Sequence, residues 1–294
     1  TATQNVIVDD VTAPSAPTLA DATGECSVSV TAPTATDNCS GTVTGTTSDP
    51  TTYNTQGSYT VTWTFDDGNG NTSTATQNVI VDDVTAPTAP TIADATGECS
   101  VTVTAPTATD NCSGTVTGTT SDPTTYNTQG SYVVTWSFDD GNGNTSTATQ
   151  NVIVDDVTAP SAPTIADATG ECSVTVTAPT ATDNCGGTVT GTTTDPTTYN
   201  TQGSYVVTWS FDDGNGNTST ATQNVIVDDV TAPTAPTIAD ATGECSVSVT
   251  APTATDNCSG TVTGTTSDPT TFSTQGSYVV NWTFNDGNGN TSTA

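Results

Sequence analysis

Apolar and hydroxyl side chains alternate most regularly between residues 58 and 66. Tyr59, Val61, Trp63 and Phe65 occupy every second position, and serine or threonine fills the positions between them. Because successive side chains of a strand point to opposite faces, this pattern predicts a half-buried strand. Trp63 is then expected to anchor a hydrophobic core rather than bind a ligand. The same role is predicted for its copies Trp136, Trp209 and Trp282.

Clusters of glycine and proline separate this segment from other short runs rich in valine and threonine. Strands are predicted over residues 16–20, 25–31, 41–47, 58–66 and 73–81. Helix-forming residues such as leucine, lysine, arginine and methionine are scarce or absent, which argues against an α-helical fold. Five to seven short strands in a segment of this size predict an all-β fold of the immunoglobulin-like β-sandwich type.

The sequence is an internal repeat. The ten residues that begin at Thr1 return at Thr74, Thr147 and Thr220, so the period is 73 residues. Four periods fill 292 residues, and Thr293-Ala294 begin a fifth copy, from which we expect a longer array. A unit of this length is large enough for a small domain, whereas a solenoid turn has roughly 20 to 45 residues.

The domain boundary is predicted after Asp10, because Val11-Thr12-Ala13-Pro14 interrupts the strand pattern with a proline. Residues 1–10 would then be the last strand of a preceding repeat. Immunoglobulin-like repeats are expected at 11–83, 84–156, 157–229 and 230–294, the last without its final strand. Such units in series predict a linear fibre of beads on a string.

The charge of the chain is one-sided: 31 aspartates and glutamates accompany no lysine, arginine or histidine, giving a net charge of −31. Nucleic acids and anionic membrane surfaces both require protein cations, so neither is an expected partner. No apolar run is long enough to insert into a bilayer. The usual general bases and amine nucleophiles are missing, and a carboxylate-only active site repeated four times is improbable, so we expect no enzyme.

Eight cysteines, two in each repeat, indicate an oxidising compartment. A zinc site is disfavoured because no histidine or CxxC motif accompanies them. Pairing within a repeat is favoured because the two cysteines lie 13 residues apart, and such a bridge would stabilise a domain by roughly 3 kcal/mol. Pairing between repeats, such as Cys26 with Cys112, is the alternative. The within-repeat pairs would be Cys26/Cys39, Cys99/Cys112, Cys172/Cys185 and Cys245/Cys258.

The acidic residues lack any basic partner, and a hard cation such as calcium is the physical remedy for their repulsion. Asp67-Gly68-Asn69-Gly70-Asn71 resembles the opening of a calcium loop, although such a sequence also suits a hairpin turn. In a sandwich this loop returns to the pole where Asp9-Asp10 enters, which predicts a calcium-stiffened, cadherin-like junction. The position of Asp37 stays open, and a merely solvated acidic surface is the alternative reading. The predicted ligands are Asp9, Asp10, Asp66, Asp67, Asn69, Asn71, Asp82, Asp83, Asp139, Asp140, Asn142, Asn144, Asp155, Asp156, Asp212, Asp213, Asn215, Asn217, Asp228, Asp229, Asp286, Asn288 and Asn290.

Several segments together resemble the hyalin-repeat (HYR) family: Thr36-Asp37-Asn38-Cys39, residues 57–63, residues 66–72 and residues 9–14. The resemblance covers the whole chain and implies an immunoglobulin-like fold and a role in adhesion. The near-identical tandem form is similar to giant surface adhesins of gliding Bacteroidota exported by the type IX system. The chain departs from the family in having only two cysteines per repeat.

Two functions follow from these patterns. The first is the stalk of a very long secreted cell-surface adhesin or extracellular fibre, which serves attachment and, by the resemblance, gliding motility. Its partners would be neighbouring repeats and a receptor bound by a tip outside this sequence. The alternative is a self-assembling extracellular filament or sheath, joined by strand exchange or lateral packing.

Overall fold

The computed structural model describes all residues from 1 to 294, and its regular structure consists of strands alone. No helix is present that is long and apolar enough to cross a membrane. The all-β class and the 73-residue repetition of sheet units are thereby confirmed. The chain divides into two compact units, Thr1–Asp155 and Asp156–Ala294.

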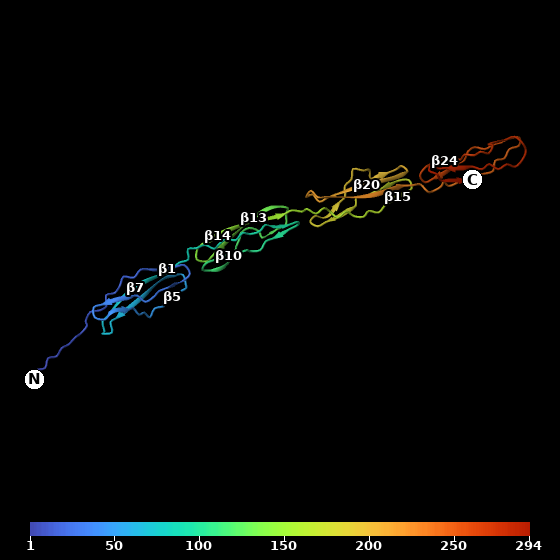
Figure 1. Ribbon diagram of the computed structural model, residues 1–294. Helices are drawn as coiled ribbons and strands as arrows, with labels where there is room; N and C mark the ends of the chain where they lie inside the picture. The colour runs from blue at the N-terminus through green and yellow to red at the C-terminus, as the bar shows by residue number, and fades with distance from the viewer. The chain divides into compact units, whose positions relative to one another are not determined.

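The first repeat is built from three small sheets (blue in Figure 1). In the largest sheet the central strand β7 pairs antiparallel with β6 and parallel with β1. Two further antiparallel pairs, β2 with β5 and β3 with β4, form the other layer. The bounds are β1 Ala22–Gly24, β2 Val28–Ser29, β3 Thr34–Asp37, β4 Gly41–Thr44, β5 Thr52–Tyr53, β6 Gly57–Asp66 and β7 Thr72–Val81.

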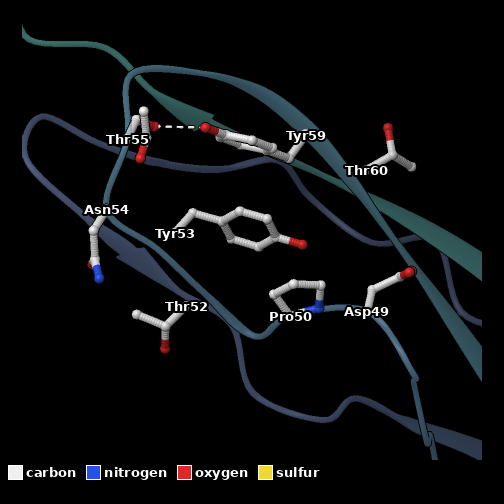
Figure 2. A pocket seen from close by; sticks show the side chains of 8 residues that line it. All are labelled: Asp49, Pro50, Thr52, Tyr53, Asn54, Thr55, Tyr59 and Thr60. Carbon is white, nitrogen blue, oxygen red and sulfur yellow. Dashed lines mark hydrogen bonds between the residues drawn. The ribbon is translucent and has the colours of Figure 1, made fainter.

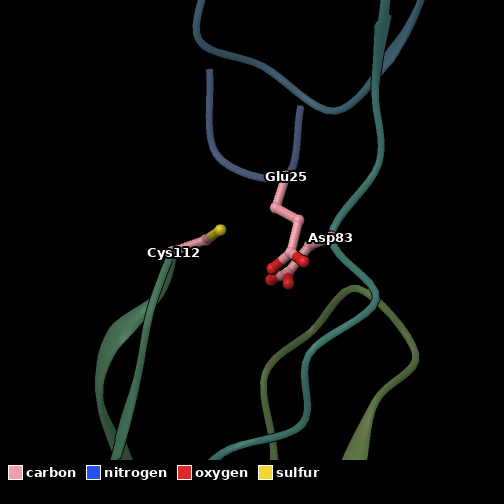
Figure 3. A group of neighbouring side chains, drawn as sticks. All are labelled: Glu25, Asp83 and Cys112. Carbon is pink, nitrogen blue, oxygen red and sulfur yellow. The ribbon is translucent and has the colours of Figure 1, made fainter. Parts of the chain in front are cut away.

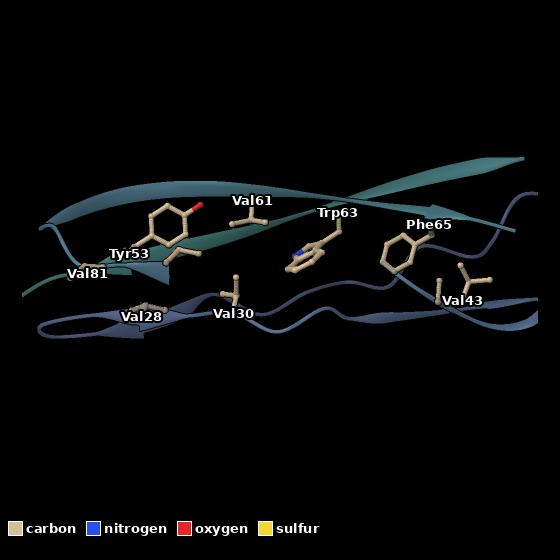
Figure 4. Close-up of a cluster of buried hydrophobic side chains, with 10 residues drawn as sticks. Val28, Val30, Val43, Tyr53, Val61, Trp63, Phe65 and Val81 are labelled. Atoms are coloured by element: carbon tan, nitrogen blue, oxygen red, sulfur yellow. The ribbon is translucent and has the colours of Figure 1, made fainter. Parts of the chain in front are cut away.

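The hydrophobic core lies between these layers, as Figure 4 shows. The alternation in β6 buries Val61, Trp63 and Phe65 on the same core-facing side of the sheet as the valines of β7, and Trp63 is only 2% exposed. The indole N–H of Trp63 donates to Gln77 Oε1 at 3.2 Å, so its polar edge is satisfied. The core role predicted for Trp63 is confirmed.

Three predicted strands of the first repeat differ from the structure. The strand predicted over 41–47 ends at Thr44 as β4. No strand covers residues 16–20, where Pro17 cannot donate a backbone hydrogen bond; a single bridge from Ser15 to Thr36 takes its place. The strand predicted over 25–31 is reduced to β2. Residues 1–8 match the sequence of β7 from Thr74 onward, but residues 1–10 form no strand, and Val6, Ile7 and Val8 are exposed.

The second repeat has the same strands and the same pairing (green in Figure 1). Its buried core is formed by the counterparts of the first, with Trp136 and Phe138 at its centre. The bounds are β8 Ala95–Gly97, β9 Val101–Thr102, β10 Thr107–Asp110, β11 Gly114–Thr117, β12 Thr125–Tyr126, β13 Gly130–Asp139 and β14 Thr145–Val154.

In the second unit, the third repeat again has seven strands, and the fourth has fewer and shorter ones. Strand β26 has three residues where β6 has ten, because the chain contains no counterpart of residues 76–81 to pair with it. The core of the fourth repeat is correspondingly small. The bounds are β15 Ala168–Gly170, β16 Val174–Thr175, β17 Thr180–Asp183, β18 Gly187–Thr190, β19 Thr198–Tyr199, β20 Gly203–Asp212, β21 Thr218–Val227, β22 Val247–Ser248, β23 Thr253–Asp256, β24 Gly260–Thr263, β25 Thr271–Phe272, β26 Thr283–Asn285 and β27 Thr291–Thr293.

Candidate metal centre at the repeat junction

The turn between β6 and β7 folds around the carboxylate of Asp67. Its Oδ1 accepts hydrogen bonds from the backbone N–H groups of Asn69 at 2.7 Å and Asn71 at 3.1 Å. Gly68 and Gly70 have φ angles of 83° and 102°, a region that side chains disfavour, which explains the glycines at these positions. The side-chain amide of Asn71 and these backbone donors hold the pKa of Asp67 below its ordinary value, so the group is a carboxylate at neutral pH.

A second carboxylate, that of Asp37 at the end of β3, is buried beside this turn with a relative exposure of 8%. Its Oδ2 accepts the backbone N–H groups of Cys39 and Ser40, each at 2.8 Å. Its Oδ1 is buried and has no hydrogen-bond partner. An unpaired oxygen of a buried carboxylate raises the free energy of the folded state, so we expect this atom to bind a ligand.

A third carboxylate comes from the segment that enters the repeat. One oxygen each of Asp10, Asp37 and Asp67 lie within 4.8 Å of one another. Calcium binds oxygens at about 2.3 to 2.6 Å, so oxygens up to about 5 Å apart can share one ion. The three residues therefore fit a calcium ion, which would supply the positive charge that the chain itself lacks.

The two asparagines of the turn bridge these acids through their nitrogens. Asn71 Nδ2 donates to Asp67 Oδ2 at 2.6 Å and to the backbone oxygen of Asp10 at 2.9 Å. Asn69 Nδ2 lies 3.5 Å from Asp10 Oδ2. In a chain without cationic side chains, amide N–H groups thus hold the entering segment against the turn, whereas the sequence predicted that these asparagines would be oxygen ligands.

The junction between the first and second repeats has the same arrangement. Oxygens of Asp83, Asp110 and Asp140 lie within 4.8 Å of one another, and Asp110 Oδ1 is buried without a partner. Asn144 donates to the backbone oxygen of Asp83 at 2.8 Å, and Asn142 to its carboxylate at 3.1 Å. The linker residue Asp83 is therefore fixed to the second repeat through its carbonyl and its side chain.

Asp83 is also fixed to the first repeat. Its backbone N–H donates to Gln56 Oε1 at 2.8 Å, and Gln56 Nε2 donates to the backbone oxygen of Glu25 at 2.9 Å. Glu25 Oε2 accepts from Thr85 at 2.7 Å and from Asn111 of the second repeat at 2.6 Å. Figure 3 shows Glu25 and Asp83 side by side, with Cys112 facing them. Both repeats thus hold the linker through direct hydrogen bonds.

A disulfide between Cys26 and Cys112 crosses this junction, so the predicted pairing within a repeat is wrong. The physical reason is strand direction. Cys26 follows β1, which pairs with the end of β7, whereas Cys39 follows β3, whose end lies beside the start of β7. The ten residues of β7 separate these poles by roughly 30 Å, which no disulfide spans. Cys39 is free, and its pKa is raised by burial and by the neighbouring carboxylate of Asp10.

The second unit repeats these contacts. Asn217 donates to the backbone oxygen of Asp156, and Asn290 to that of Asp229, each at 2.8 Å. Asp229 N–H donates to Gln202, as Asp83 does to Gln56. Cys172 is bonded to Cys258, Cys245 is free, and Cys99 and Cys185 are disulfide-bonded too.

The predicted ligands therefore divide into two groups. The second acid of each predicted pair, such as Asp10 and Asp67, lies in a carboxylate cluster, whereas Asp9 and Asp66 lie exposed outside it. Asp66 instead caps the turn by accepting the N–H of Gly68 at 2.9 Å. The buried acid Asp37 was not among the predicted ligands. Its position stays open in the sequence because the expected Cys26–Cys39 bridge does not allow Asp37 to be placed at the junction.

A shallow pocket of about 450 Å³ on the first repeat contains Asp49 and two stacked tyrosines (Figure 2). The rings of Tyr53 and Tyr59 lie 4.5 Å apart, and Tyr59 donates to the backbone oxygen of Thr55 at 2.9 Å. Burial, and then the charge of Asp49, raises the pKa of Tyr53. In the fourth repeat Phe272 stacks on Tyr278 at 4.4 Å, so the stack forms without this hydroxyl. Tyr53 is therefore a packing residue of the core.

Sequence comparison relates the chain to hyalin. It is 35% identical over 266 residues to a hyalin of Lytechinus variegatus, covering 80% of this chain and 50% of that protein. It is also 35% identical over 281 residues to a hyalin of Strongylocentrotus purpuratus, covering 83% of this chain and 23% of that protein. The chain thus spans half or less of the length of these relatives. No model of a protein family matches it.

Solved structures with similar chains include two extracellular proteins. A calcium-stabilised adhesin that helps an Antarctic bacterium bind ice has 17% identity and a TM-score of 0.29, with 91% of each chain covered. The extracellular domain of protocadherin γB4 has 18% identity and a TM-score of 0.26, with 64% of this chain and 42% of that one covered.

Proposed function

We propose that the chain is a structural segment of an extracellular fibre or adhesin stalk, in which calcium at the repeat junctions makes the linkers rigid. The disulfides support an oxidising, extracellular location. The sequence similarity to hyalin supports a tandem array of structural repeats rather than an enzyme. Export by a type IX system and a role in gliding stay predictions from the resemblance to surface adhesins.

The observation that carries the proposal is the unpaired oxygen of Asp37 and its copies. The carboxylate that carries this oxygen lies beside a carboxylate of the linker, Asp10, and a carboxylate of the turn, Asp67. Repulsion among three neighbouring negative charges destabilises the folded state, and a bound divalent cation would offset this repulsion. Because Asp83, the counterpart of Asp10, is also bonded to the preceding repeat through Gln56, a cation bound to it would oppose bending at the linker.

Calcium titration of the whole chain tests the proposal. Calorimetry is expected to show binding, and calcium is expected to raise the unfolding temperature. Small-angle X-ray scattering is expected to show a narrower range of molecular dimensions with calcium than with chelator. Absence of binding heat and of any thermal shift at millimolar calcium would refute the cation.

Two matched variants locate the site. Changing the acid with the buried, unpaired oxygen in each repeat to asparagine is expected to abolish the calcium-induced thermal shift and to raise the stability of the calcium-free protein, because repulsion is relieved. The control changes the exposed turn acid, which is naturally Asn285 in the fourth repeat and keeps the same cap there at 2.8 Å. An equal loss in both variants contradicts the assignment. The test positions are Asp37, Asp110, Asp183 and Asp256, and the control positions are Asp66, Asp139 and Asp212.

Assembly by strand exchange is a second candidate. Val6, Ile7 and Val8 are exposed, whereas Val79 and Val81, the counterparts of the two valines, are buried in the first core. Light scattering that finds only monomers at high protein concentration would refute this candidate.

A further inference from the structure

We propose that the disulfides between repeats act as strain limiters, which carry tension past the folded cores of the first and third repeats so that these repeats do not lengthen by unfolding. This inference concerns the path of covalent bonds along the chain. It depends on the pairing of the cysteines and not on the cation proposed above.

The bridge from Cys26 to Cys112 defines a covalent shortcut. The two cysteines are 86 residues apart in sequence but have Cα atoms 4.9 Å apart. A pull applied before Cys26 and after Cys112 passes through the sulfur atoms, because they form the shorter covalent path. Residues 27–98 form a loop that bears none of this tension once the path is taut.

The bypassed loop contains the whole buried core of the first repeat. Every buried residue of that core, from Val28 to Val81, lies between the two cysteines. The long strands β6 and β7, which would otherwise unravel under load, lie inside the loop. Of the strands of this repeat, only β1 precedes Cys26 and lies on the loaded path.

The second unit has the same construction. The bridge from Cys172 to Cys258 again spans 86 residues, with Cα atoms 5.0 Å apart. The buried core of the third repeat, from Val174 to Val227, lies wholly within it. The two bridges do not overlap in sequence, so the lengths of chain that they remove from the loaded path add together.

Pairing within repeats would have a different mechanical effect. A bridge between cysteines 13 residues apart, as between Cys26 and Cys39, would hide only those residues and leave β6 and β7 on the loaded path. At roughly 3.4 Å per extended residue, one observed bridge hides about 29 nm of chain, whereas a within-repeat bridge hides about 4 nm. Pairing between repeats is therefore what protects the cores.

Force spectroscopy on single molecules of the whole chain tests the proposal, with handles attached at the two ends through peptide tags and chelator present throughout. The fully stretched oxidised chain is expected to be shorter than the same chain in dithiothreitol by at least about 60 nm, from two loops of 86 residues. A difference of about 18 nm or less, as four within-repeat bridges would give, overturns the proposal. The chelator keeps this result independent of calcium.

Two variants sharpen the test. The double variant Cys26→Ser with Cys112→Ser is expected to lengthen the stretched oxidised chain by about 20 to 30 nm. The matched control Cys39→Ser removes a cysteine that is free and is expected to leave the length unchanged. If the double variant does not fold, the comparison of oxidised and reduced wild type still decides, and an oxidised wild type that yields no Cys26–Cys112 peptide also overturns the proposal.

Discussion

Gly45 occupies a position where the core has no room for even one methyl group. A Cβ atom built at this residue would lie 3.0 Å from Phe65 Cε1 and 3.3 Å from the backbone oxygen of Pro33. Neither side can retreat, because Phe65 is fully buried and Gly45 N–H donates to Pro33 oxygen at 2.8 Å. Replacing this glycine by alanine therefore overpacks the core, which typically costs 1 to 3 kcal/mol. The equivalent glycines are Gly118, Gly191 and Gly264, each against its own phenylalanine.

Changing all four glycines to alanine destabilises every repeat, so the unfolding of the whole chain is affected. We expect the unfolding temperature to fall by roughly 4 to 8 °C per kcal/mol for repeats of this size, measured by calorimetry. Phe65→Leu and its equivalents, which remove the crowded ring atoms, supply the second arm of a double-mutant cycle. The combined variant is expected to be less destabilised than the sum of the two changes. Additive losses, or an unchanged transition in the glycine variant, would refute the crowding argument.

Three further predictions concern the bridge, the core tryptophan and the aromatic stack. Replacing Cys26 and Cys112 together by serine should lower the free energy of unfolding by about 4 to 5 kcal/mol in denaturant titrations, because an 86-residue loop is released; an unchanged midpoint would contradict the pairing. Trp63→Phe should cost about 2 kcal/mol, since it loses volume and the hydrogen bond to Gln77, and a neutral result would remove Trp63 from the core account. Tyr53→Phe should be nearly neutral whereas Tyr53→Ala should cost about 3 kcal/mol, and equal losses in thermal melts would show that the hydroxyl matters.

The long strands were predictable because their signal is purely local. The alternation of Tyr59, Val61, Trp63 and Phe65 placed β6 within one residue of its observed start. The short strand β3 was not predicted, since its four residues offer one small apolar side chain, Ala35, to the core. Its identity as a strand comes from pairing with β4, which is a tertiary contact.

The cysteine pairing and the place of Asp37 in the carboxylate cluster could not be predicted from neighbouring residues, for one common reason. Loop-closure entropy favours the nearest partner in sequence, but the direction of β1 and β3 places Cys26 and Cys39 at opposite ends of the repeat. The assumed pairing also left Asp37, two residues before Cys39, without a position. Once the strands fix Cys39 beside the entering segment, Asp37 falls next to Asp10 and Asp67.

The contacts at the junctions join residues at constant offsets along the sequence: the asparagine contacts at 59 and 61, and the disulfides at 86. A gene that gains or loses whole 73-residue units by recombination between its near-identical copies therefore recreates each of these contacts at the new boundary. Such a gene can change the number of repeats in its product in one genetic event, with no compensating mutation.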